Sequence, residues 1–209
     1  MAIFDTTKQD FKDNYKLLIG SVVPRPIAVV STVNEDGTSN IAPFSFFTVV
    51  SANPMIIGFT PMIRSSDGEQ KDTLKNILRQ KEFVVNFVTQ HNYEKVNLCS
   101  TELPHGESEF DFAKLTELDS EVVTPKRMKE SPIHFECKLR DTLSYGDVPG
   151  TGTFVTGEVV RVHVEDELLD QGRIDQDKYA PMGRGAGNDW IVCDHRVQIE
   201  RLMKAQIQK

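Results

Sequence analysis

Five polar residues within a ten-residue stretch have the types and spacing that suit a bound phosphate. They are Arg64, Ser65, Ser66, Lys71 and Thr73, in a turn-rich segment that leads into an apolar pattern typical of a helix from about residue 73. A phosphate monoester needs cationic side chains, hydroxyls and the free N–H groups of a helix start. A solvated polar loop that ends in an ordinary helix cap is the alternative that the same residues allow.

A second stretch with binding chemistry is 40–48, which reads Asn-Ile-Ala-Pro-Phe-Ser-Phe-Phe-Thr. A proline followed by alternating aromatics and small hydroxyl residues is unsuited to a central strand, so we expect a strand that opens into a binding loop. Backbone groups beside Ala42 and Ser45, flanked by phenylalanines, would suit a planar heteroaromatic with a polar edge. Core packing by these phenylalanines on an irregular strand is the alternative. Together the two stretches would bind a ring at one end and a phosphate at the other.

No signature of a common catalytic machinery appears elsewhere in the chain. The glycine cluster at 183–187 is late and is not followed by a clear helix, which argues against a Rossmann dinucleotide site. The sequence has no Walker-type phosphate loop and no Gly-x-Ser-x-Gly, and its five histidines have no metal-ligand spacing. We therefore predict a distributed small-molecule site with no catalytic side chain and no bound metal.

Length, charge and cysteine content limit the class of protein. A chain of 209 residues with 39% hydrophobic and 26% charged residues suits one globular domain, which we assign to residues 1–209. A net charge of −7 argues against a sequence-independent nucleic-acid binder, and no apolar run is long enough for a membrane helix. Three widely spaced cysteines predict reduced, mostly buried thiols, and the N-terminus lacks a signal pattern, so we expect a cytoplasmic protein.

Apolar patterning predicts the elements that must position the two stretches. Runs at 25–33 and 40–48 around the turn at 34–37 predict a β-hairpin. Further strands are expected at 55–60, 82–88, 133–140 and 160–164. Helices are expected at 11–20 (or a lead-in segment), from about 73 with Asp72 or Thr73 as the cap, and at 91–99. A polar loop is expected at 100–112, and 195–207 fits either a strand or a helix.

Alternation within two of these strands predicts which side chains face the core. From Ile133 to Leu139 the odd-numbered residues are apolar, so they are expected to face in and the residues between them to face solvent. The valines at 160, 162 and 164 are expected to face in by the same pattern. At least six strands with two or three short helices predict a mainly β fold, an antiparallel barrel with helical decoration, because parallel winding would need a helix between most strands.

Short motifs that follow in order over about residues 20–190 give the chain a resemblance to a known family. They lie at 24–32, 40–45, 53–57, 71–77, 82–86, 109–110, 115–116, 131–132, 136–139, 157–160 and 162–164. The first two read Pro-Arg-Pro-Ile-Ala-Val-Val-Ser-Thr and Asn-Ile-Ala-Pro-Phe-Ser. The set resembles the flavin reductase-like, FMN-binding split-barrel proteins, which include flavoredoxin. The resemblance implies an antiparallel split β-barrel of the Greek-key type, and a homodimer with one non-covalent FMN per subunit near the dimer interface.

The resemblance also implies which residues would hold the FMN. One set would lie against the isoalloxazine and bind its polar edge through main-chain groups, and a second set would hold the 5′-phosphate. The ring set is Ser31, Thr32, Asn40, Ile41, Ala42, Pro43, Phe44 and Ser45. The phosphate set is Arg64, Ser65, Lys71 and Thr73, which agrees with the site expected from the residue types.

The function implied by this resemblance is an FMN-dependent oxidoreductase of the NAD(P)H:flavin reductase type. The flavin would take electrons from a nicotinamide and pass them to free flavin, a partner protein or another acceptor, while the protein supplies orientation and electrostatics. A flavoredoxin-like electron carrier, with a redox partner protein as donor, is the first alternative. A flavin-binding module without turnover is the second.

The late glycine segment departs from the family pattern. Family members commonly carry an Arg-Leu-Gly-Gly-like sequence followed by Tyr, whereas this chain reads Arg-Gly-Ala-Gly-Asn-Asp-Trp over 184–190. The segment would border the ring or the nicotinamide, or it would leave Trp190 packed beside a loop.

Overall fold

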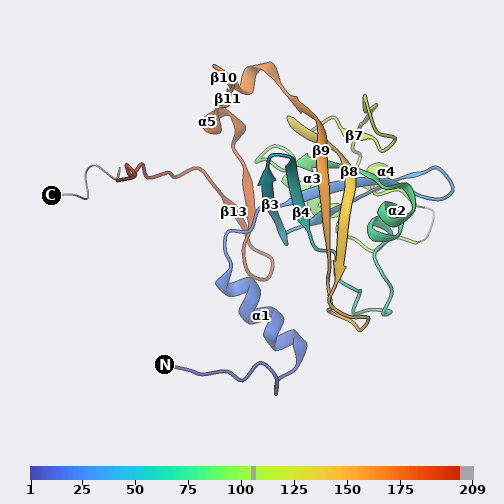
Figure 1. The fold of residues 1–209 in the computed structure, drawn as a ribbon, viewed down its shortest axis with the longest axis vertical. Coiled ribbons are helices and arrows are strands. Elements are labelled where there is room, and N and C mark those ends of the chain that lie inside the picture. Colours follow the sequence, from blue (N-terminus) through green and yellow to red (C-terminus); the bar gives the residue numbers. More distant parts are fainter. Residues whose placement is uncertain (105–106, 203–209) are drawn as a thin grey trace.

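Seven strands form the main sheet of the protein, in the order β2-β1-β5-β8-β9-β4-β3 (Figure 1). The computed structural model describes residues 1–104 and 107–202. All neighbouring strands in this sheet are antiparallel, so the predicted mainly β, antiparallel class is confirmed. The strands are β1 (Ala28–Val33), β2 (Ser39–Phe44), β3 (Phe47–Ala52), β4 (Met55–Phe59), β5 (Glu82–Phe87), β8 (Ile133–Ser144) and β9 (Thr153–Val164).

The predicted hairpin is formed by β1 and β2, with Ala28 opposite Phe44 and Val33 opposite Ser39. β2 runs through Pro43, and only two residues separate it from β3. The strand accommodates a proline because it lies at the edge of the sheet, where a missing N–H breaks no ladder hydrogen bond. The second stretch, 40–48, is therefore an edge strand up to Phe44, followed by residues 45 and 46 and the start of β3.

The helices that precede β8 in the described part of the chain are α1 (Phe11–Ser21), α2 (Asp72–Gln80), α3 (Tyr93–Leu98) and α4 (Glu109–Phe112). The helix predicted at 11–20 is confirmed, although Gly20 lies inside it and the N–H of Val22 closes it. α2 has Lys71 as its N-cap, so the predicted capping by Asp72 or Thr73 is wrong. α4 falls within the predicted polar loop at 100–112, of which residues 105–106 lie outside the described part.

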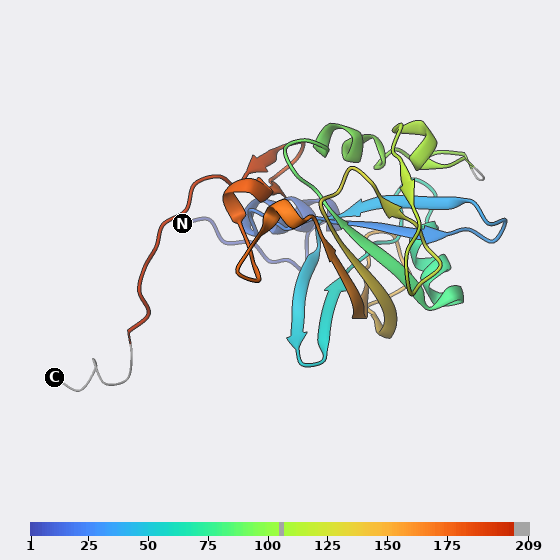
Figure 2. The same ribbon diagram turned by 90° about the horizontal axis from the view of Figure 1, so that it is seen from above.

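Two apolar clusters pack on either side of β1, because alternate side chains of a strand point to opposite faces. Val29 belongs to the first cluster, which includes Phe110 of α4. Ala28 and Val30 belong to the second cluster, which includes Ile77 of α2. Figure 2 shows the green helices of residues 93–112 on one side of the sheet and α2 on the other. β2, which contains residues 40–44 of the second stretch, thus pairs with a strand that is packed on both faces.

The outward face of β8 is buried at His134 and Glu136, where the prediction of solvent exposure is wrong, whereas Lys138 and Arg140 on the same face are exposed. Glu136 has no exposed surface and His134 has 5%. The segment that contains β6 (Glu117–Leu118) and β7 (Arg127–Met128) contacts this face, and the N–H groups of residues 121 and 122 donate to the Glu136 carboxylate. The alternation of apolar residues on the other face concealed this second layer.

The valines of β9 do not follow the predicted pattern. Val160 and Val162 are 39% and 43% exposed, so their inward placement is wrong. Arg161 pairs with Glu136 while Val159 pairs with Cys137, which leaves Val160 as an extra residue in β9. This bulge changes the side-chain alternation along the strand.

The C-terminal part adds short elements beside the sheet. They are η1 (Asp166–Leu168), β10 (Leu169–Asp170), β11 (Arg173–Ile174), α5 (Gln176–Tyr179), β12 (Met182–Arg184) and β13 (Trp190–Val192). Residues 195–202 form neither helix nor strand, and 203–207 lie outside the described part. The N-terminal segment before α1 and residues 195–202 extend away from the sheet (Figures 1 and 2).

Within residues 1–104 and 107–202, no helix has the length and hydropathy of a membrane span. The three cysteines are free thiols, and Cys99 and Cys137 are buried as predicted, whereas Cys193 is half-buried.

Candidate functional site

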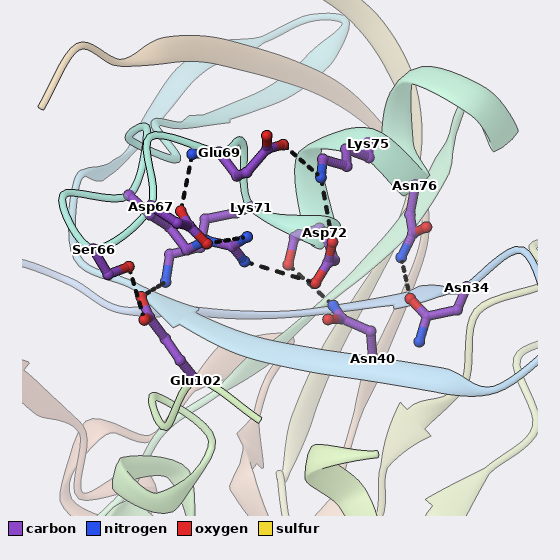
Figure 3. Close-up of polar contacts among 12 residues, drawn as sticks. Asn34, Asn40, Ser66, Asp67, Glu69, Lys71, Asp72, Lys75, Asn76 and Glu102 are labelled. Atoms are coloured by element: carbon purple, nitrogen blue, oxygen red, sulfur yellow. Dashed lines mark hydrogen bonds and ion pairs between the residues drawn. The ribbon is translucent and has the colours of Figure 1, made fainter. Parts of the chain in front are cut away.

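The predicted phosphate residues lie in the loop between β4 and α2, where each cation contacts a carboxylate. Arg64 forms an ion pair with Asp67 at 2.8 Å. Lys71 Nζ lies 3.4 Å from Glu102, whose other carboxylate oxygen accepts a hydrogen bond of 3.0 Å from Ser66 (Figure 3). The Arg64 side chain is 17% exposed, and its hydrogen bond with Asp67 raises the pKa of its guanidinium. The loop is therefore a preorganised group of charges at the start of α2.

The first turn of α2 leaves backbone donors free for a ligand. No side chain caps this N-terminus, because Lys71 occupies the N-cap position and makes no side-chain cap hydrogen bond. The first N–H groups of a helix have no partner within the helix, and the helix dipole favours an anion beside them. Thr73 is buried in this turn, and its hydroxyl accepts a hydrogen bond of 3.0 Å from Asn40 of β2. This bond ties the helix start to the ring stretch.

The two predicted binding stretches meet around one cavity of about 110 Å³. From β2 it is lined by Asn40, Ala42, Pro43 and Phe44, and from the loop and α2 by Arg64, Lys71, Asp72 and Thr73. Ile41 points to the other side of β2, into the first apolar cluster, as strand alternation requires. The N–H of Ile41 donates to the carboxylate of Glu109 at 3.1 Å, which holds this part of the edge strand.

Ser31 and Thr32 lie outside this arrangement. Both are fully buried, and Ser31 Oγ donates to the carbonyl oxygen of Lys126. Thr32 Oγ1 accepts hydrogen bonds from Asn40 and Asn76 at 3.1 and 3.0 Å. Their role as ring contacts stays a prediction, and in this structure their hydroxyls support the strand behind the cavity.

A larger cavity of about 710 Å³ lies between α1 and the body of the protein. It is lined by Phe11 and Tyr15 of α1, by Phe46 and by Tyr145, and Ser65 also borders it. Tyr15 and Phe46 lie with their ring centroids 6.3 Å apart. Arg64, Lys71 and Glu102 line this cavity and the smaller one alike, so the two cavities share a charged wall. An aromatic chamber beside a phosphate-sized charged niche suits a planar ring with a phosphorylated side chain.

Similarity in sequence and fold to known proteins assigns the chain to a family. The model of the flavin reductase like domain matches residues 19–182. The chain belongs to the flavin reductase-like family. The uncharacterized protein BH2278 of Halalkalibacterium halodurans is 44% identical over 86% of each chain. The crystal structure of nitrilotriacetate monooxygenase component B from Bacillus cereus is similar with a TM-score of 0.90, 37% identity and coverage of 95% of this chain and 98% of that one.

The split-barrel architecture expected for the flavin reductase-like family is also present. The structure of a flavin reductase with a split barrel domain from Shewanella frigidimarina matches 97% of this chain and 100% of its own, with a TM-score of 0.81. At 21% identity this likeness concerns the fold. The predicted split β-barrel is confirmed.

The family implies a bound flavin, and the residues of this chain fit one. The uncapped start of α2, with Arg64 and Lys71 beside it, has the donors and charges that a flavin phosphate requires. The Ala42–Phe44 part of β2 adjoins the same cavity and offers apolar contacts next to main-chain groups.

Several residues of the site were not predicted from the sequence. Glu102 lines both cavities, and Glu109 lies in the smaller one, where burial raises the pKa of its carboxyl despite the hydrogen bond from Ile41. Both lie in the segment predicted as a loop, where an acidic residue carries no signal of its own. The aromatic residues of α1 were likewise assigned only to a possible helix, because nothing in the sequence pairs that helix with the loop before α2.

Trp190, whose role was left open, is partly buried. It contacts the first apolar cluster, and its ring centroid lies 5.8 Å from that of Tyr93. The Arg184 guanidinium lies 5.3 Å from the centroid of the Trp190 ring. Trp190 lines neither cavity. The departure from the family pattern at 184–190 therefore corresponds to a packed hairpin turn.

Proposed function

We propose that this flavin reductase-like protein is an FMN-dependent oxidoreductase that takes electrons from NADH or NADPH. The observation that supports this most directly is the meeting of Asn40–Phe44 with Arg64, Lys71 and Thr73 around one cavity at the uncapped start of α2. Family membership supports a flavin, and the phosphate-type chemistry of this niche favours FMN over a flavin without a phosphate.

In this proposal the residues of the chain bind and orient the cofactor. Arg64, Ser65, Lys71 and Thr73 would hold the phosphate, while the ring would lie along 40–45. Bound FMN would supply the redox chemistry by accepting a hydride from the nicotinamide. The ring would extend into the aromatic chamber beneath α1, where the nicotinamide would lie against its exposed face and access of water would be limited. The protein then needs no side chain that moves a proton, in keeping with the absence of a catalytic motif.

The decisive experiment combines a spectrum with a reduction assay. The purified protein should show flavin absorbance bands, and anaerobic addition of NADH or NADPH should bleach them. Bleaching confirms both cofactor and donor. A flavin spectrum that neither nucleotide bleaches would contradict the reductase function and favour the electron carrier, in which a reduced partner protein should bleach it instead.

We also propose that the protein is a homodimer, because apolar side chains remain uncovered on one part of the sheet. Val49 and Val50 of β3 are 74% and 48% exposed, and Val160 and Val162 on β9 are exposed as well. β3 is an edge strand, and the cyan β3–β4 hairpin projects from the body in Figure 2. Apolar surface of this kind is typical of an interface between copies.

The dimer is tested by the mass in solution. The wild-type chain should have twice the monomer mass, and Val49→Glu combined with Val162→Glu should give a monomer, because each charge would be buried without a partner. The matched control is Leu202→Glu, which adds the same charge at an exposed position outside this surface. A monomeric wild-type protein with flavin bound would contradict the proposal.

The free cysteines support a reducing location for the protein. Cys99 and Cys137 are buried thiols that form no disulfide. Free thiols persist in compartments kept reduced by glutathione or thioredoxin. We therefore propose that the protein functions in the cytoplasm.

A further inference from the structure

A buried arginine lies beneath the C-terminal end of α1 without an acidic partner. Arg25 is 4% exposed, and no carboxylate among the described residues forms an ion pair with it. Its neighbours are carbonyl oxygens of residues 19, 22 and 185 and the hydroxyl of Ser45. A buried charge without a counter-charge is costly, and an arginine keeps its proton in a protein. The surroundings of Arg25 therefore favour an anion.

Nearby charges strengthen this preference. Burial lowers the pKa of Arg25, the phenol of Tyr15 opposes the shift, and Arg184 adds to it. The backbones of Arg25 and Arg184 are joined by N–H to carbonyl hydrogen bonds of 2.9 and 2.8 Å. Arg184 thus adds a second positive charge near Arg25, and the opposing charge comes from the weakly acidic phenol of Tyr15.

The hydrogen bonds of Arg25 leave donors available. A guanidinium has five N–H groups. Nη1 donates to the carbonyl oxygens of Ile19 and Val22, Nη2 donates once to Gly185, and Nε donates to Ser45 Oγ at 3.3 Å. Among the described residues, one N–H of Nη2 has no acceptor, and the Ser45 hydroxyl accepts a hydrogen bond from Nε without donating one. Two donors therefore remain, one on each side chain.

These donors border a cavity of about 230 Å³ that is otherwise apolar. Its remaining wall consists of Leu18, Val22, Pro26, Phe46 and Phe47. Leu18 and Phe46 also line the aromatic chamber, so the two cavities adjoin beneath α1. The volume suits a molecule with a single ring, and the two phenylalanines offer flat surfaces to it.

We infer that this cavity is a binding subsite for a small aromatic carboxylate, whose anionic group is held by Arg25 and Ser45. A carboxylate has two oxygens, which match the two available donors. A phosphate has more oxygens than the cavity can satisfy, and a neutral ring would leave the charge of Arg25 unbalanced. The inference concerns a second ligand and goes beyond the proposed flavin chemistry. Ser45 ends the ring stretch, so the acid would bind next to the proposed flavin position.

The test compares benzoate with benzamide, which has the same shape without the charge. In calorimetric titrations of the purified full chain, benzoate should bind at least about tenfold more tightly than benzamide. Arg25→Gln should weaken benzoate binding by about tenfold or more and leave benzamide unchanged, and Arg25→Lys should lie between. Arg140→Gln, at a 63% exposed side chain of β8, is the matched control and should bind benzoate as the wild type does.

Other outcomes would overturn the inference. Equal affinity for the two probes, no measurable benzoate binding, or full benzoate affinity in Arg25→Gln would each do so. Loss of benzoate binding in a variant without Arg64 and Lys71, but not in Arg25→Gln, would place the anion in the phosphate niche instead. Should Arg25→Gln fail to fold, Ser45→Ala tests the same contact and should weaken benzoate binding severalfold. The visible spectrum of each sample reports the flavin separately, so failure of the flavin proposal leaves the benzoate result interpretable.

Discussion

Replacing Arg64 and Lys71 together with alanine should weaken FMN binding by a factor of about 30 or more. Each cation would lose a charge-assisted phosphate contact of about 1–3 kcal/mol, and about 1.4 kcal/mol corresponds to a tenfold change in affinity. We expect the lower end of this range. Arg64 and Lys71 already contact Asp67 and Glu102, so the phosphate gains only the difference between the two environments.

Riboflavin and a neighbouring lysine provide the controls. Riboflavin has the same ring without the phosphate, so its affinity should be nearly the same for the wild type and the double variant. Lys75→Ala removes a charge from the same helix, but Lys75 lines neither cavity and should leave FMN binding unchanged. Fluorescence quenching of added flavin measures all these affinities. Equal FMN affinity of the wild type and the double variant would refute the phosphate assignment.

Acidification is expected to destabilise the protein through His134 of β8. Its Nε2 lies 2.8 Å from the carbonyl oxygen of Met128, and its Nδ1 has no partner among the described residues. Burial lowers the pKa of His134 from 6.5 to about 4. The Met128 carbonyl and Glu136 oppose this shift, whereas Arg127 and His163 add to it. The folded protein therefore resists protonation of this side chain.

The direction of the effect follows from proton binding in the two states. In the unfolded chain a histidine takes up a proton as the pH falls below about 6.5. Folded His134 stays neutral until about pH 4. Because the unfolded state binds more protons between these values, the free energy of unfolding should fall by on the order of 3 kcal/mol across this window.

Urea unfolding at several values between about pH 7 and pH 4 measures this dependence. His134→Phe should be less stable than the wild type at neutral pH, because it loses the hydrogen bond to Met128, but its stability should change less with pH. His91→Phe alters an exposed histidine and should keep the wild-type dependence. If His134→Phe loses stability in acid as steeply as the wild type, the proton uptake belongs to another group.

Glu136 should extend the loss of stability to lower pH. Burial raises the pKa of this carboxyl, but the N–H groups of Glu121 and Val122 together with His163 outweigh burial and lower it overall. A lowered pKa means that Glu136 stabilises the fold above its ordinary pKa, and that this contribution disappears as the pH falls through the folded value. Both groups therefore make the protein sensitive to acid in the same direction.

Much of the fold could be predicted from local patterns, because alternation and turn residues act over a few positions. The Asp-Gly turn and its flanking apolar runs determined the β1–β2 hairpin, and the β-branched run determined β5. The patterns failed where a distant segment altered the surroundings. His134 and Glu136 are polar residues at alternate positions of β8, and only the segment that contains β6 and β7 buries them.

The candidate site was likewise predictable in part from local sequence and in part only from the tertiary structure. Residue types and spacing alone determined that Arg64, Lys71 and Thr73 could serve a phosphate, since a helix start and two cations close in sequence are close in space. Only the tertiary structure decided that Asn40 donates a hydrogen bond to Thr73, that Glu102 lines both cavities, and that α1 forms one wall of the larger cavity. It also decided that Arg25, which lies between two prolines in the sequence, is buried without an acidic partner among the described residues. Such contacts join segments far apart in the chain, and they depend on how the sheet brings its edge strand, its helices and its loops together.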